Sequence, residues 1–227
     1  FPENLFDLQI AQLLINTIYL VFLSGLVLLT FSLLSNYGNR VSNNKVLNFL
    51  STLSISGYAI PGVILAIAFI SFIAWLDDNM IKSFGLSSIK KLFIGSIVGL
   101  VLVYFIRFYS LAFNGIKSGY EKINIYVDES AYLLGYSKRK TFLNIHIPFL
   151  RNSLLFVGIL ISLEILRELP ITLILRPFNF ETFATTAYIS ASEDLLEAAA
   201  VPSLFLILIA TFFIIISSKY ILRETNE

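Results

Sequence analysis

The sequence has no cysteine, one histidine and few charged residues. Only 14% of its 227 residues are charged, whereas a soluble domain usually carries about 25%. The lack of cysteine excludes disulfides, thiolate chemistry and cysteine-based metal sites. A glycine-rich phosphate loop ending in Lys-Ser or Lys-Thr is also missing, so we do not expect the chain itself to bind ATP. The net charge of +1 gives no bulk attraction to nucleic acid.

Apolar residues dominate what remains. They make up 57% of the chain, and the mean hydropathy is +0.82. About 20 consecutive apolar residues suffice to cross the hydrocarbon core of a bilayer. The sequence therefore predicts an all-α, polytopic membrane helix bundle in one transmembrane domain, 1–227. About five transmembrane helices are expected, at 10–34, 59–76, 92–113, 150–169 and 201–218.

Two intervals between these segments carry further predictions. Pro61 and Gly62 interrupt the second apolar region, which predicts a short interfacial helix up to about Ser56 and then a span. A proline kink inside one tilted span is the alternative. Residues 77–91 are expected to form a loop. In the interval 176–199, Phe183, Ala187 and Ala191 recur at helical spacing and predict a short interfacial or re-entrant helix.

The longest polar interval, about 115–149, separates the third and fourth apolar segments. Val127, Ala131 and Leu134 recur at helical spacing and would share one face. Asp128 lies where a helix N-terminus favours negative charge. Gly135 permits a left-handed backbone that would end this helix. A cytoplasmic loop of this length, with its own apolar stripe, is expected to contact a partner.

A second short helix should follow in the same interval. Ser137 can cap it, and Phe142, Ile145 and Phe149 would share one face. Pro148 would kink or reset the chain before the next span. We interpret His146 as a surface or interface residue, because one histidine without partners cannot make a metal site.

The residues of this interval resemble the EAA signature of ABC-transporter permease subunits of the type I importer fold. That signature reads Glu-Ala-Ala, three residues, Gly, nine residues, Ile-x-Leu-Pro. Ser130 replaces the middle alanine and Ile147 replaces the leucine. A second Glu-Ala-Ala at 197–199 lacks the later glycine and proline and is discarded. Five residues match the signature, and with the two replacements they are the candidate ATPase-coupling residues: Glu129, Ser130, Ala131, Gly135, Ile145, Ile147 and Pro148.

The resemblance implies a coupling helix that docks in a groove of a cytoplasmic ABC ATPase. Glu129, Ala131 and Gly135 would make its contacts and its turn. The partner binds and hydrolyses ATP, so the chain would be no enzyme and would have no catalytic residue and no cofactor of its own. Further implied partners are a periplasmic substrate-binding protein, a second permease half or subunit and the lipid bilayer.

Other runs are similar to the C-terminal half of iron(III) ABC permeases. The most specific are Glu168-Leu169-Pro170 and the run 175–182. That subfamily commonly fuses two permease halves, so the resemblance implies that this chain is the second half. Because the chain opens at Phe1 and not at Met, we expect a processed or partial product. The resemblance also implies ferric iron as the substrate. The similarity extends to Asn16-Thr17, Ala59-Ile60-Pro61-Gly62, Arg107-Phe108, Ala191-Ser192-Glu193 and Glu197-Ala198-Ala199.

The basic residues indicate an orientation. Cytoplasmic loops are enriched in Lys and Arg. With five spans, ten of the sixteen basic residues fall on the side of the central loop and five on the other. Arg107 is not counted on either side, because it is assigned to a position within its span, near the inner end. The bias predicts an N-terminus outside and a C-terminus in the cytoplasm. The resemblance implies that the membrane is the bacterial inner membrane.

Charged residues also gather toward the outer end of the fourth span. Arg167 can pair with Glu164 in a helix. Charges within a span usually face the bundle interior or a watery cavity. Glu164, Arg167, Glu168 and Arg176 are therefore candidates for the translocation path or an outer gate. The alternative is a self-neutralising cluster that fixes the helix at the interface. We assign no metal ligand.

Three other functions remain open. The same fold could carry thiamine, a polyamine or a sulfate-type oxyanion, against which the Leu175-Arg176-Pro177 run argues. An ion-driven secondary transporter would show inverted repeats and broken helices at the midplane, and no repeat is visible. A membrane enzyme would need paired carboxylates or a histidine cluster, and the sequence supplies neither.

Overall fold

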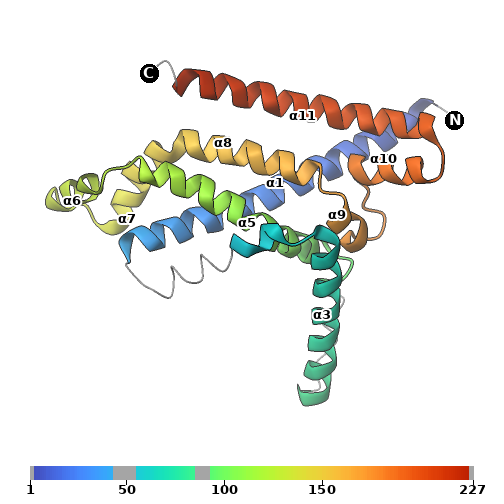
Figure 1. The fold of residues 1–227 in the computed structure, drawn as a ribbon, viewed down its shortest axis with the longest axis horizontal. Helices are drawn as coiled ribbons and strands as arrows, with labels where there is room; N and C mark the ends of the chain where they lie inside the picture. The colour runs from blue at the N-terminus through green and yellow to red at the C-terminus, as the bar shows by residue number, and fades with distance from the viewer. Residues whose placement is uncertain (1–2, 43–54, 85–92, 225–227) are drawn as a thin grey trace.

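The computed structural model describes residues 3–42, 55–84 and 93–224, and the regular elements in these ranges are all helical (Figure 1). The all-α prediction is therefore confirmed. The elements are α1 (Glu3–Val41), η1 (Ile55–Ala59), α3 (Gly62–Phe84), α5 (Ile97–Glu121), α6 (Ile125–Leu133), α7 (Lys138–Thr141), η2 (Phe142–His146), α8 (Ile147–Leu166), α9 (Pro170–Leu175), α10 (Phe183–Ser192) and α11 (Leu196–Glu224).

Five of the described helices are long and apolar enough to cross a membrane, as predicted. The spanning segments are Gln9–Val41, Gly62–Asn79, Ile97–Glu121, Lys138–Leu166 and Leu196–Ser218. The prediction of a loop from residue 77 is wrong for the first part of that interval. Residues 77–84 continue α3, and the Asp77 side chain is buried. The polar residues misled the prediction because a buried carboxylate does not end a helix whose backbone hydrogen bonds continue.

The break predicted at Pro61 is present. The 3-10 turn η1 ends at Ala59, and α3 begins at Gly62. Proline has no N–H to donate and is tolerated where a helix starts, since the first N–H groups lack intrahelical acceptors. The short helix predicted before Ser56 falls largely at 43–54, outside the described residues.

The core forms where α1, α5 and α8 pack together. Its largest buried side chains include Tyr104 and Phe108 of α5. Gly115 and Gly119 lie on the face of α5 that meets α8, and their missing side chains let the two backbones approach closely. This Gly-x-x-x-Gly spacing was not used in the sequence-based predictions, although it is a known sign of helix packing in membranes.

The helix predicted through Phe183, Ala187 and Ala191 is α10, which packs against α11. Thr182 and Thr185 form a capping box at its start. The short helix α9 was not predicted. Its six residues follow Leu169 directly, and six residues are too few to show helical periodicity.

The helix ends fall into two groups. The C-terminal ends of α1, α5 and α11 lie at the same end of the bundle as α6 and α7, while α9 and α10 lie at the other end (Figure 1). This grouping agrees with a central loop and a C-terminus on one side. The helix α3 projects steeply away from the other long helices in this view, and it contacts α5 and α9.

Candidate functional site

The central interval forms two short helices, as helical spacing, Gly135 and Ser137 predicted. The Asn124 side chain accepts a hydrogen bond from the Tyr126 N–H at 3.1 Å and starts α6. Gly135 has φ +81°, a left-handed conformation that glycine adopts without steric cost, and the helix ends just before it. Ser137 caps α7 by accepting from the Lys140 N–H. The segment therefore encodes its own local structure.

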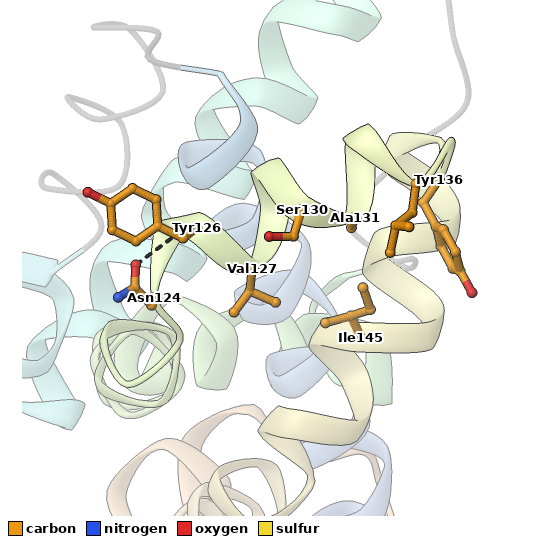
Figure 2. Close-up of a pocket in the computed structure, with 8 residues that line it drawn as sticks. Asn124, Tyr126, Val127, Ser130, Ala131, Tyr136 and Ile145 are labelled. Atoms are coloured by element: carbon orange, nitrogen blue, oxygen red, sulfur yellow. Dashed lines mark hydrogen bonds between the residues drawn. The ribbon is translucent and has the colours of Figure 1, made fainter.

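A shallow groove of about 480 Å³ runs along α6 (Figure 2). Val127, Ala131 and Leu134, which were predicted to share one helix face, all line it. Ile145 of η2 completes the lining together with Tyr126 and Tyr136 near the ends of the segment. Apolar side chains at an open groove suit the insertion of a partner's apolar side chain.

The residues matched to the signature take different positions around α6. Glu129 and Ser130 are exposed, whereas Ala131 is buried. Gly135 and Pro148 are exposed, and Ile145 and Ile147 are half-buried. The discarded copy at 197–199 begins α11, at the end of the bundle away from α6 (Figure 1).

The end of α6 also exposes apolar side chains that the signature does not include. Leu133 is 89% exposed and Leu134 is 79% exposed. Tyr126 at the start of the helix is also exposed. Large apolar side chains gathered at one site, unlike scattered ones, usually mark an interaction surface.

The face predicted for the second helix is not formed. Phe142 and Ile145 are half-buried, but Phe149 is exposed. The reason is the π-helical turn η2, which follows α7 and leads directly into α8. A π turn places more residues per turn than an α-helix and rotates the residues that follow it. Pro148 therefore lies in the first turn of α8, where its missing N–H costs little.

His146 was interpreted as a surface or interface residue, and this is wrong. Its side chain is fully buried, and its Nε2 lies 2.6 Å from Oδ1 of Asp128. The second oxygen of Asp128 accepts a hydrogen bond from Nε of Arg40 at 2.7 Å. We call Arg40, Asp128 and His146 the inner triad. Sequence reasoning missed it because its members are far apart in the chain.

A second polar cluster lies inside the bundle. Nε of Arg107 is 3.1 Å from Oε2 of the buried Glu168, and Nη1 of Arg107 donates to the Ile60 carbonyl at 2.6 Å. Arg107 lies in the first half of α5, which runs from Ile97 to Glu121. Its assignment near the inner end of a span is therefore wrong. A Cβ at Gly62 would lie 2.6 Å from Oε1 of Glu168, so a side chain at this position would displace the carboxylate from its present place.

Glu168 also organises the break between α8 and α9. Its Oε1 accepts from the Ile171 N–H at 3.4 Å, and its carbonyl accepts from the Thr172 hydroxyl at 2.6 Å. The Thr172 hydroxyl also hydrogen bonds to Tyr104 of α5. The cluster thus ties together two backbone breaks, at Pro61 and at Pro170, and the middle of α5.

The four predicted gate residues do not share one network. Arg167 pairs with Glu164 on the exposed end of α8, as the spacing predicted. Glu168 pairs with Arg107, and Arg176 pairs with Glu181 in the segment before α10. Burial lowers the pKa of the Arg176 guanidinium from its usual value.

Asn16 and Thr17, noted in the resemblance, attach the start of α10 and the residues just before it to α1. The Asn16 amide donates to the Glu181 carbonyl at 2.9 Å, and the Thr17 hydroxyl accepts from the Phe183 N–H at 3.2 Å. Both side chains are buried. Within the described ranges, no three His, Cys, Asp or Glu side chains gather as metal ligands.

The sequence comparisons and the structural comparison differ in outcome. No model of a known protein family matches the sequence, and no curated protein matches it. Among solved structures, the chain is similar to a chain of a bacterial alginate ABC transporter, solved in complex with a periplasmic protein that binds an alginate pentasaccharide. The TM-score is 0.75 at 16% identity, over 91% of this chain and 76% of that one. This protein therefore shares its fold with a component of a bacterial ABC transporter.

Proposed function

We propose that the chain is the transmembrane permease subunit of an ATP-driven ABC importer in a bacterial inner membrane. The observation that carries this proposal is α6, a separate short helix that presents exposed Leu133 and Leu134 at one end of a bundle of membrane-length helices. The fold similarity to an ABC transporter component supports it. On this proposal residues 1–227 act as one permease domain.

The proposed mechanism needs no catalytic residue and no cofactor in this chain. A cytoplasmic ATPase binds ATP, closes as a dimer and displaces α6, which docks on it. The spans move with α6 and release substrate that a periplasmic binding protein has delivered. A second permease half or subunit completes the path. Small or exposed residues of α6, Ser130 and Ala131 among them, allow the partner to approach the helix backbone.

The orientation follows from the same proposal. The basic bias of the central loop and the common end of α1, α5, α6 and α11 favour a cytoplasmic C-terminus and an outer N-terminus. The exposed end of α8, with Arg167 and Glu164, would then face outward.

For the identity of the transported substrate we propose ferric iron, and this assignment rests on the sequence resemblance alone. Reconstituted vesicles with the ATPase inside and the binding protein outside should accumulate ferric iron, and thiamine, polyamines and sulfate should not enter. Uptake of one of those compounds in place of iron would retain the permease assignment and reject the iron assignment.

Leu133→Asp should abolish association with the ATPase. The side chain is 89% exposed, so the folded chain tolerates a carboxylate, but a docked interface would bury it. Loss of a central interface residue costs about 2 kcal/mol or more, roughly thirtyfold in affinity. Co-purification of tagged chain with candidate ABC ATPase subunits in mild detergent measures the effect.

Phe178→Asp is the matched control. Phe178 is 93% exposed, in the connection between α9 and α10 at the other end of the bundle. It should retain the ATPase as the wild type does. If the wild type retains no ATPase, or if both variants retain it equally, the permease assignment fails and an ion-driven transporter becomes the better hypothesis.

A further inference from the structure

The coupling helix α6 has few attachments to the bundle. Of its nine residues, all within the described part of the chain, only Asp128 and Ala131 are buried. Its Asn124 cap is exposed, and so are Leu133 and Leu134. Apolar burial therefore cannot hold this helix firmly, since the gain from burial scales with the area removed from water.

Asp128 supplies the attachment that apolar burial does not. Its Oδ2 accepts from Nε of Arg40 in α1 at 2.7 Å, and its Oδ1 is 2.6 Å from Nε2 of His146 before α8. Both contacts join charged or polar groups that are mostly withdrawn from solvent. Charge-assisted hydrogen bonds of this length are about twice as strong as neutral ones. One carboxylate thus connects α6 to two spanning segments.

Arg40 extends the connection to a third span, α5. Its guanidinium donates to the carbonyls of Tyr120, Ile123 and Asn124 at 3.2, 3.0 and 3.2 Å. Carbonyls at the end of a helix lack intrahelical donors, so these bonds fix the end of α5 and the turn into α6. The guanidinium also lies over the Tyr120 ring at 5.7 Å. Arg40 therefore joins α1, the end of α5 and α6 through one planar group.

Aromatic rings enclose His146, and its burial among them costs free energy. The rings of Tyr37, Tyr120 and Phe142 surround the imidazole at centroid distances of 5.7, 5.5 and 6.5 Å. Nε2 faces the Asp128 carboxylate and can serve as the donor in this contact. Nδ1 is buried with no hydrogen-bond partner among the described residues, and an unpaired buried nitrogen costs free energy. The π turn η2 thus holds the ring against Asp128 despite this cost.

We propose that the inner triad is the mechanical link between the coupling helix and the spans, so that Arg40, Asp128 and His146 are positioning residues for transport. This inference rests on the proposed function and deepens it. Movement of α6 passes through Asp128 to α1 and to the start of α8, and through Arg40 to the end of α5. The surface that binds the ATPase, centred on Leu133 and Leu134, is separate from the link.

Asp128→Asn tests the link in the complete transporter. The amide keeps the size of the side chain but removes its charge and one acceptor. We expect ATPase association within about threefold of wild type. Substrate-stimulated ATP hydrolysis and uptake should each fall at least about tenfold, a loss of about 1.4 kcal/mol. Amide exchange of residues 125–134 should speed up about tenfold, while exchange in α11 stays unchanged.

Two further variants sharpen the test. Glu121→Gln removes an exposed carboxylate at the same end of the bundle and should change none of the three readouts. Arg40→Lys keeps the charge beside Asp128 but cannot reach three carbonyls and the carboxylate together. It should fall between wild type and Asp128→Asn in uptake and in exchange.

The outcomes separate the two proposals. Unchanged coupling and exchange in Asp128→Asn overturn the link. Loss of ATPase association in that variant also overturns it, because the triad would then shape the docking surface instead of transmitting its movement. Failure of the wild type to bind any ATPase rejects the proposed function, and the exchange data still decide whether Asp128 holds α6.

Discussion

Replacing Arg107 with methionine should cause severe loss of the folded protein. The substitution leaves the Glu168 carboxylate buried without its counter-charge and the Ile60 carbonyl without the donor at 2.6 Å. Removal of one partner of a buried ion pair typically costs about 3–5 kcal/mol. The folded fraction in detergent, followed by fluorescence-detected size-exclusion chromatography over a temperature series, should show a markedly lower midpoint.

The neighbouring ion pair provides the control for Arg107→Met. Arg167 is 69% exposed beside Glu164, so Arg167→Met should cost at most about 1 kcal/mol. The double variant Arg107→Met/Glu168→Met should recover much of the lost stability, because no charge is left buried alone. Equal unfolding midpoints for Arg107→Met and Arg167→Met would show that the polar cluster of Arg107 and Glu168 does not hold the two backbone breaks together.

Gly115→Ala together with Gly119→Ala should separate α5 from α8. A Cβ at Gly115 would lie 2.5 Å from Cγ2 of Val157, and one at Gly119 would lie 2.7 Å from Oγ of Ser153. Val157 cannot turn aside cheaply, because a β-branched side chain in a helix has one strongly preferred rotamer. Overpacking costs about 1–3 kcal/mol at each site. The same thermal series measures the loss.

Gly25→Ala is the matched substitution in α1, since a Cβ there meets none of the described atoms within 4 Å. It should leave stability unchanged or raise it by up to about 1 kcal/mol, as helix propensity alone predicts. Val157→Ala should rescue Gly115→Ala by making room for the new methyl group. A stable double glycine variant, or no rescue, would contradict close α5–α8 packing.

The sequence predicted those features that depend on neighbouring residues. Hydropathy found the five long helices, because a span needs only a sufficient apolar length. Ser137, which caps α7, and the left-handed Gly135 act within a few residues of themselves, so α6 and α7 form where the sequence placed two helices. Asn124, the cap of α6, acts equally locally but was not used in the prediction. Helical spacing likewise placed Val127 and Ala131 on one groove.

The polar contacts between helices could not be predicted in this way. Arg40 and Asp128 are 88 residues apart, and Arg107 reaches a carbonyl 47 residues away. Such pairings depend on how the helices pack, which no local pattern specifies. For the same reason His146 was assigned to the surface: its neighbours in sequence give no sign of the carboxylate and the rings that enclose it.

The resemblance to the permease family rests on short runs scattered along the sequence, and it gives no reason why these runs occur together. The structure brings three of them together, because Arg107 contacts both Glu168 and the Ile60 carbonyl and Gly62 lies against Glu168. Asn16 and Thr17 likewise meet the run that ends at Thr182, because they bind the backbone at Glu181 and Phe183. Runs far apart in sequence are therefore parts of shared contacts.

The projecting helix α3 has a consequence for biogenesis. Among the described elements it packs mainly against α5 and α9, which follow it in the chain, so these contacts form only after later residues are made. Ile64, Ile67 and Phe72 along it stay exposed in the described part of the folded chain. A membrane quality-control protease would treat a copy with this face uncovered as an unassembled subunit and degrade it. If the second permease half or subunit of the proposed transporter covers α3, the half-life of the protein in the cell should depend on the supply of that partner more than on its own rate of synthesis.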